Sequence, residues 1–139
     1  MPDLVATAGN AGNFNTLLKA AETAGVVDIL KSPGPYTVFA PTDEAFDKLP
    51  QGTLDSLLQD TDKLKRIILY HVAFGDVRSE DLKQIDEAPT VEGSVLGVDS
   101  TDGQIQVNDA NVVKTDILTD NGVIHVIDKV LIPELVKSE

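Results

Sequence analysis

The two histidines, His71 and His125, are the side chains of this sequence best suited to metal binding or to acid–base chemistry. A zinc site needs three or four ligands of the Cys, His or carboxylate type. The chain has no cysteine, and no third ligand stands at helical or hairpin spacing from either histidine. Their immediate neighbours are apolar or aromatic, which favours two core histidines held by hydrogen bonds. We therefore expect structural histidines, no metal ion and no cofactor, with a paired role for the two as the alternative.

Acidic residues offer a second kind of chemistry, at turns and in adjacent pairs. Asp99, Asp102 and Asp109 suggest calcium, but their segment lacks the ligand spacing, the sixth-position glycine and the twelfth-position glutamate of an EF-hand loop. The pairs Asp43–Glu44 and Glu80–Asp81 stand where helices are expected to begin, and there capping explains them. The sequence has neither a Gly-x-Ser-x-Gly elbow nor a phosphate-binding glycine loop. We therefore expect that the protein is not an enzyme; catalysis by a pair of carboxylates, as in glycosidases, is the alternative.

Charge and length limit the classes of partner. The 139 residues include 23 acidic and 11 basic side chains, a formal net charge of -12, which opposes nucleic acids and anionic lipid surfaces. No apolar run approaches the roughly 18 residues of a membrane span. The length fits one domain, for which we expect the whole chain, 1–139. The start, Met1-Pro2-Asp3, lacks the pattern of a signal peptide, so a trimmed mature protein and a cytoplasmic protein would look alike.

Helical spacing dominates the first half of the chain. Phe14, Leu17, Leu18 and Ala21 lie on one helical face, with Asn13 as the expected cap. A shorter helix over 28–31 and a loop over 32–35 follow. Residues 53–70 are again helical and pass into a strand near Tyr70, and a short helix reaches Leu82, with Ser79 as its expected cap.

The segment YTVFAPTDEAFDKLP, residues 36–50, combines a strand with the start of a helix. Residues 36–40 are β-formers, and Pro41 ends the strand because it cannot donate to a ladder. Thr42 or Asp43 is expected to cap the next helix. Pro50 and Gly52 then end that helix. Local chemistry thus explains this segment as a structural seam, which means a strand, a stop and a capped helix that position the core.

A period of two replaces helical spacing after Thr90. Ile105 and Val107 alternate with polar residues, and the Asp-Asn-Gly sequence at 120–122 predicts a hairpin turn. The last apolar strand is bounded by Pro133. Helices come first and strands later, which indicates an α+β fold and not a parallel, doubly wound sheet.

Several of these segments together resemble one family. Residues 36–50 resemble the first signature of the fasciclin domain family, and ILYHVAFGDV at 68–77 resembles its central Tyr-His segment. DILTDNGVIHVIDKVLIP at 116–133 is similar to the second signature, and IQVNDANVVKTDI at 105–117 to its Asn-Ala strand pair. The resemblance covers about residues 4–133. It implies a wedge-shaped β-sandwich with several helices packed on it, the fold class that we expect.

The same resemblance implies a location and a function. Family members are mostly secreted, periplasmic or anchored at the cell surface, and act in adhesion and matrix contacts. A single domain without cysteine is more similar to bacterial members, so we expect a secreted, periplasmic or surface location, with a leader removed and Met1 added. The partner would be a protein or a cell-surface or matrix component, bound by a monomer. A domain that binds a small ligand or a carbohydrate is the alternative, although 4% aromatic residues disfavour sugar stacking.

The resemblance also marks four candidate binding residues. In animal members an Asp-Ile pair before the second signature and the Tyr-His segment are linked to integrin binding; here Asp116 and Ile117, and Tyr70 and His71, occupy those places. An exposed carboxylate beside an apolar anchor is suited to metal-dependent adhesion. The alternative has Ile117 in the core and Asp116 as a turn residue, and we expect Tyr70 and His71 to face inward.

Overall fold

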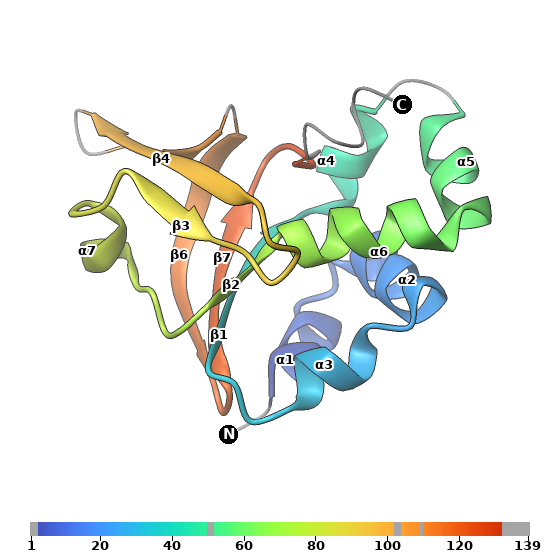
Figure 1. The fold of residues 1–139 in the computed structure, drawn as a ribbon, viewed down its shortest axis with the longest axis horizontal. Coiled ribbons are helices and arrows are strands. Elements are labelled where there is room, and N and C mark those ends of the chain that lie inside the picture. The colour runs from blue at the N-terminus through green and yellow to red at the C-terminus, as the bar shows by residue number, and fades with distance from the viewer. Residues whose placement is uncertain (1–2, 50–51, 102–103, 109, 132–139) are drawn as a thin grey trace.

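The computed structural model describes residues 3–49, 52–101, 104–108 and 110–131 (Figure 1). Pro50, Asp102, Asp109 and Pro133, on which some of the expectations above fall, lie outside these ranges. Among the described residues no helix is both long and apolar enough to cross a membrane.

Helices make up most of the first half of the chain. They gather on one side of the sheet, to the right in Figure 1, except α7, which lies on the other side. The expected continuous helix over residues 53–70 is divided in two at Asp60, whose backbone is not helical. The helices are α1 (Leu4–Ala11), α2 (Asn15–Ala24), α3 (Val27–Lys31), α4 (Asp43–Asp47), α5 (Thr53–Gln59), α6 (Thr61–Tyr70) and α7 (Ser79–Leu82).

Seven strands form one sheet in the order β2-β1-β7-β6-β5-β4-β3. β1 pairs with β7 in parallel, and the other pairs are antiparallel. The two ends of the sheet also meet, because Ala73 bridges Thr90 and the Val91 N–H donates to the Val72 carbonyl at 2.8 Å. The strands are β1 (Tyr36–Pro41), β2 (Val72–Phe74), β3 (Glu87–Pro89), β4 (Val95–Thr101), β5 (Gln104–Val107), β6 (Ala110–Thr119) and β7 (Gly122–Ile127).

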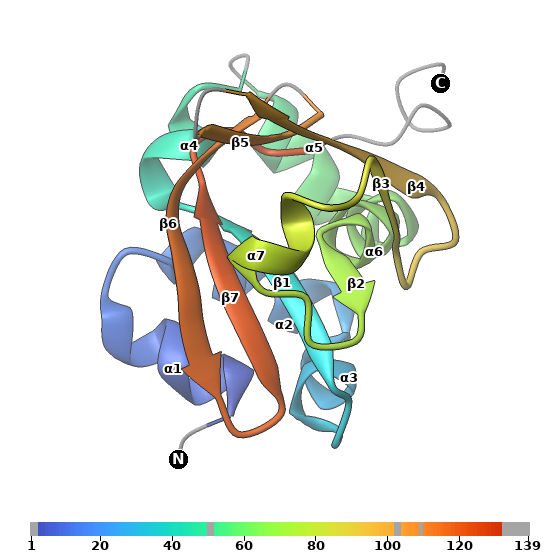
Figure 2. The same ribbon diagram turned by 90° about the vertical axis from the view of Figure 1, so that its left-hand side faces the viewer.

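This curled sheet has a core on each face. In Figure 2, β6 and β7 lie to the left and β3 and β4 to the right, which gives the two arms of the expected wedge. Alternate residues of β1 point to different cores: Val38 and Ala40 join the cluster under the helices, and Phe39 joins the cluster between the arms. The α+β class and the wedge with packed helices are thus confirmed, and β1 contributes side chains to both cores.

The segment 36–50 forms the expected seam. β1 ends at Pro41, and Thr42 caps α4 by accepting a hydrogen bond from the Ala45 N–H at 3.2 Å. Asp43 has a further role that local spacing did not predict, because its carboxylate accepts from the Thr16 N–H in the first turn of α2 at 2.8 Å. The bond from the Thr16 backbone lowers the pKa of Asp43 below its ordinary value. Asn13 therefore does not cap α2; Asp43 does so from α4.

Replacement of Thr42 by alanine is expected to lower the free energy of unfolding by about 1 kcal/mol, the usual cost of losing a helix N-cap. Urea denaturation should show a lower midpoint at an unchanged slope. Thr61→Ala is a suitable control, since Thr61 is exposed at the start of α6 and Asp60 caps that helix. If the two variants unfold at the same midpoint, the hydroxyl of Thr42 contributes no more than an ordinary surface group.

The turn at residues 120–122 joins β6 to β7, as its sequence predicts, but its central side chain is buried. Asn121 is 6% exposed, and its amide nitrogen donates to the carbonyls of Leu30 and Ser32, each at 2.7 Å. Its amide oxygen accepts from the Leu4 N–H at 2.9 Å. A Cβ on Gly122 would overlap the Tyr36 carbonyl, so only glycine fits there. One asparagine thus ties the hairpin to the ends of α1 and α3.

Candidate functional site

Asp116 lies at an irregular point of β6, on the side of the sheet that carries α7. The register against β7 shifts twice, between Val112 and Lys114 and between Lys114 and Ile117, so that β6 carries an extra residue at each place. The backbone of Asp116 is left-handed, with φ of 58°, a conformation that aspartate tolerates better than most residues. This bulge turns the carboxylate of Asp116 toward α7.

Both oxygens of that carboxylate are hydrogen-bonded to the first residue of α7. The Ser79 N–H donates to Oδ1 at 2.8 Å, and the Ser79 hydroxyl donates to Oδ2 at 2.5 Å. Partial burial raises the pKa of Asp116, but the two bonds from Ser79 outweigh it and hold the pKa below its ordinary value. Ser79 is therefore not the helix cap that the sequence suggested. It is the first helical residue, and Asp116 satisfies its N–H from the sheet.

Ile117 points away from Asp116. It is half-buried against the cluster under the helices and lies opposite Ile124 of β7. The Asp116 carboxylate bonds to α7 while Ile117 packs under the other helices, so the Asp-Ile pair does not form one continuous surface. The apolar neighbour of Asp116 on the outer face is Leu118, which is 42% exposed. Asp116, Leu118 and α7 border an open depression of about 320 Å³.

The Tyr-His segment ends α6 and lies in the interior, as expected. Tyr70 is 5% exposed; its hydroxyl accepts from the Asn108 side chain at 3.0 Å and donates to the Val95 carbonyl at 3.4 Å. His71 is 1% exposed, its Nδ1 donates to the Ile67 carbonyl at 2.7 Å, and its Nε2 accepts from the Leu131 N–H at 2.8 Å. Tyr70 thus joins β4 to the turn after β5, and His71 holds the chain that follows β7.

His125 occupies the face of the sheet opposite His71. It is fully buried, stacks on Phe39 with the ring centres 5.7 Å apart, and donates from Nε2 to the Val77 carbonyl at 2.7 Å. Its Nδ1 accepts from the Asp116 N–H at 3.3 Å. Burial lowers the pKa of both histidines, that of His71 to about 4, so both rings are neutral at pH 7. The expectation of hydrogen-bonded core histidines is confirmed.

Three side chains together hold the loop before α7 against the sheet. The Thr37 hydroxyl accepts from the Val77 N–H at 2.8 Å and donates to the Gly75 carbonyl at 2.7 Å. His125 donates to the Val77 carbonyl, and Asp116 accepts from Ser79. The carboxylate of Asp116 is thus fixed in place and remains exposed at its outer edge. In the described ranges no group of three His, Cys, Asp or Glu side chains could hold a metal ion.

Comparison with known proteins places this geometry in a family. The sequence profile of the fasciclin domain matches residues 12–133. The chain belongs to the fasciclin domain family. An uncharacterised protein of Synechocystis sp. is 47% identical to it over 132 residues, which make up 95% of this chain and 98% of that protein. The cell surface glycolipoprotein MPB83 of Mycobacterium bovis is 36% identical over 137 residues, which span 94% of this fasciclin chain and 61% of the glycolipoprotein.

A solved structure shows the same fold. A fasciclin domain pair from the insect cell adhesion molecule fasciclin I superposes with a TM-score of 0.85 at 22% identity, over 97% of this chain and 52% of the pair. At that identity the likeness concerns the fold. By their names, the glycolipoprotein is a cell-surface protein and fasciclin I is a cell adhesion molecule.

The four candidate binding residues lie in different parts of the structure. Asp116 is exposed, Ile117 is half-buried, and Tyr70 and His71 are inside, so the four candidate residues do not share one surface. Leu118 and Ser79, which border Asp116, were not among the candidates. The period of two along a strand could have placed Leu118 on the same face as Asp116, whereas no local signal pairs Ser79 with a strand 37 residues later.

Proposed function

We propose that this fasciclin domain is an interaction module without catalytic activity, which binds a protein or another component of a cell surface or matrix. We place it outside the cytoplasm, as a secreted, periplasmic or surface protein, and take residues 1–139 as one domain that acts as a monomer. Family membership supports this proposal, and so does the name of its surface-located relative. Neither nucleic acid nor a lipid bilayer is a proposed partner of so acidic a chain.

The observation that carries the proposal is the exposed face formed by β6 and α7. It combines an ionised carboxylate, fixed by hydrogen bonds to Ser79, with the exposed side chain of Leu118. A fixed carboxylate binds a cationic or metal-bridged partner at little cost in side-chain entropy, and an apolar side chain next to it supplies an anchor. We assign the contact to Asp116 and Leu118.

The other predicted binding residues have supporting roles in this proposal. Ile117 packs under the helices and sets the register that turns Asp116 outward. Tyr70 and His71 hold β4 and the segment after β7. Their replacement would affect binding through the fold and would lower stability at the same time. Asp116→Asn keeps an acceptor for the Ser79 N–H, and Leu118→Ser changes an exposed side chain, so both should lower stability less.

Capture from an extract of the native cell surface or surrounding matrix tests this assignment. Asp116→Asn and Leu118→Ser are expected to weaken binding of a captured partner about tenfold, which corresponds to roughly 1.4 kcal/mol. Asn can still accept from the Ser79 N–H, so the melting temperature should change little. Glu22→Gln, an exposed charge change on α2, is the matched control. Equal capture by all four proteins, with no folding defect, would remove Asp116 and Leu118 from the binding surface.

A further inference from the structure

A row of apolar side chains crosses the place where the two ends of the sheet meet. Phe74 of β2 lies opposite Tyr36 of β1, and Pro89 of β3 lies opposite Val95 of β4. The bridge that joins β2 to β3 one position away places Phe74 beside Pro89, and Figure 2 shows these two strands side by side. The apolar row, Tyr36, Phe74, Pro89 and Val95, therefore spans four neighbouring strands.

Most of the apolar row is open to solvent. Phe74 is 57% exposed, Val95 is 47% exposed, and Pro89 is exposed between them. Tyr36 is half-buried at the edge of the cluster under the helices. Single apolar side chains on a surface are common, but adjacent ones that include an aromatic ring are typical of an interaction surface.

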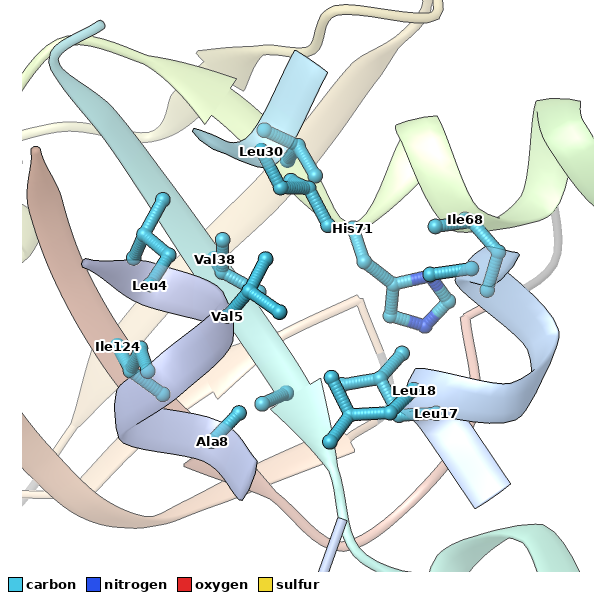
Figure 3. Close-up of a pocket in the computed structure, with 13 residues that line it drawn as sticks. Leu4, Val5, Ala8, Leu17, Leu18, Leu30, Val38, Ile68, His71 and Ile124 are labelled. Atoms are coloured by element: carbon cyan, nitrogen blue, oxygen red, sulfur yellow. The ribbon is translucent and has the colours of Figure 1, made fainter. Parts of the chain in front are cut away.

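The interior beneath α1 does not offer a partner comparable room. The cavity there measures about 20 Å³, close to the space that one water molecule needs (Figure 3). Leu4 and Ala8 of α1 are buried in the same cluster as α2 and α6, so this helix is part of the core. The apolar row, and not this cavity, is accessible to another molecule.

The pairing of the four strands limits the form of a partner. β1 lies between β2 and β7, β4 lies between β3 and β5, and β2 meets β3 at the bridge, so a partner here lies across the strands and does not add to an edge. Neighbouring strands are about 4.8 Å apart, so every second side chain of the row recurs after about 9.6 Å. A polyproline II helix has about three residues per turn and rises about 3.1 Å per residue, so its side chains i and i+3 recur after about 9.3 Å.

The charge beside the row determines which proline-rich segment is suitable. Glu87 is exposed on the same face of β3, two positions before Pro89. Asp76, beyond the end of β2, is exposed as well but already pairs with Arg78 at 3.1 Å. The net charge of -12 extends the negative potential beyond the row. A lysine or arginine of the partner is therefore attracted toward Glu87, and an acidic side chain is repelled.

We propose that the apolar row binds a proline-rich segment of another protein, in the polyproline II conformation, with a basic residue beside Glu87. Proline rings pack on Phe74 and Val95, and proline has no N–H that the contact would leave without a partner. This conformation is preformed, so little conformational entropy is lost on binding. The contact involves neither Asp116 nor Leu118 and is independent of the surface that we assign to them.

A titration followed by nuclear magnetic resonance, with an end-blocked peptide of one arginine and nine prolines, tests this proposal. The ring signals of Phe74 and the methyl signals of Val95 should shift until they saturate. The methyl signals of Val113, which is 61% exposed on β6, should stay in place. A peptide of one arginine with alternating glycine and serine, which is a flexible coil, should bind at least about tenfold more weakly.

Charge and contact are tested separately. Glutamate in place of arginine should weaken peptide binding at least about threefold, and Glu87→Gln should reduce that difference. Phe74→Ser should weaken binding of the arginine peptide at least about tenfold. Val113→Ser, the matched change of an exposed apolar residue outside the row, should bind within about twofold of the unmodified chain.

Several results would overturn the proposal. These are no shift of Phe74 up to the solubility limit of the peptide, equal shifts of Val95 and Val113, equal binding of the flexible peptide, or unchanged binding by a folded Phe74→Ser. Shifts of the row when the protein alone is concentrated would assign it to a second copy of this chain, and tighter binding of a helical peptide of the same charge would assign it to a helix. Should Phe74→Ser fail to fold, the comparison of Val95 with Val113 in the unmodified chain still decides the question.

Discussion

Asn121→Asp should lower the free energy of unfolding by about 3–6 kcal/mol. The amide nitrogen of Asn121 donates to two buried backbone carbonyls, and a carboxylate has no hydrogen to donate. Each buried acceptor left without a partner costs about 1–3 kcal/mol, and a carboxylate facing carbonyl oxygens adds electrostatic repulsion. The bonds that the Leu4 N–H and the Thr119 hydroxyl donate to the side-chain oxygen can persist. The measurement is urea denaturation followed by circular dichroism.

Asn10→Asp is the matched control for this substitution. Asn10 is exposed near the end of α1, so the same change of charge there should cost less than about 1 kcal/mol, the size of a helix-dipole interaction. Wild-type stability of Asn121→Asp would mean that its bonds to Leu30 and Ser32 contribute nothing to the fold.

Acidification from pH 7 to pH 5 should lower the free energy of unfolding by about 2 kcal/mol through His71 alone. Burial lowers the pKa of His71 from 6.5 to about 4, so between these values the unfolded chain binds a proton that the folded protein does not. The stabilisation is complete above pH 6.5 and is lost progressively as the pH falls toward 4. His125, whose pKa is also lowered, changes stability in the same direction.

The carboxylates act in a separate, lower pH range. The pKa values of Asp43, Asp116 and Asp128 are lowered from 3.8, so their contributions persist above that value and are lost below it. His71→Gln removes one of the two titrating histidines and should reduce the difference in stability between pH 7 and pH 5. Urea midpoints at both pH values measure this, and a flat profile for the unmodified chain would show that His71 accepts a proton in the folded state.

The sequence predicted those elements that depend on neighbouring residues. The strand expected over residues 36–40, the helix cap at Thr42 or Asp43, the hairpin at 120–122 and the transition to a strand near Tyr70 all have signals within a few positions. The order of helices and strands was sufficient for the α+β class. The wedge shape was predicted only from the resemblance to the fasciclin family, because the spacing of apolar residues does not show how a sheet curls.

Contacts distant in sequence account for the rest. Its neighbours in sequence place Asp43 in the first turn of α4, yet its carboxylate caps α2, where it accepts from a residue 27 positions earlier. Asn121 has the turn preference of any Asn-Gly pair, and three of its side-chain hydrogen bonds reach α1 and the end of α3. The bulge at Asp116 depends on the register between β6 and β7. Each such polar side chain completes hydrogen bonds that only the folded chain brings within reach.

The two bulges of β6 also bear on self-association. In the described part of the chain, β5 pairs with β6 only at Asn111 and Ala110, so the longer part of β6 has one edge without a neighbouring strand. Such an edge, with Val113 61% exposed, is the kind of template on which identical chains add strand to strand and grow into fibrils. An extra residue at two places breaks the regular spacing of donors and acceptors that an incoming strand would have to match. The same irregularity that turns the Asp116 carboxylate toward α7 therefore opposes amyloid-like stacking of identical chains.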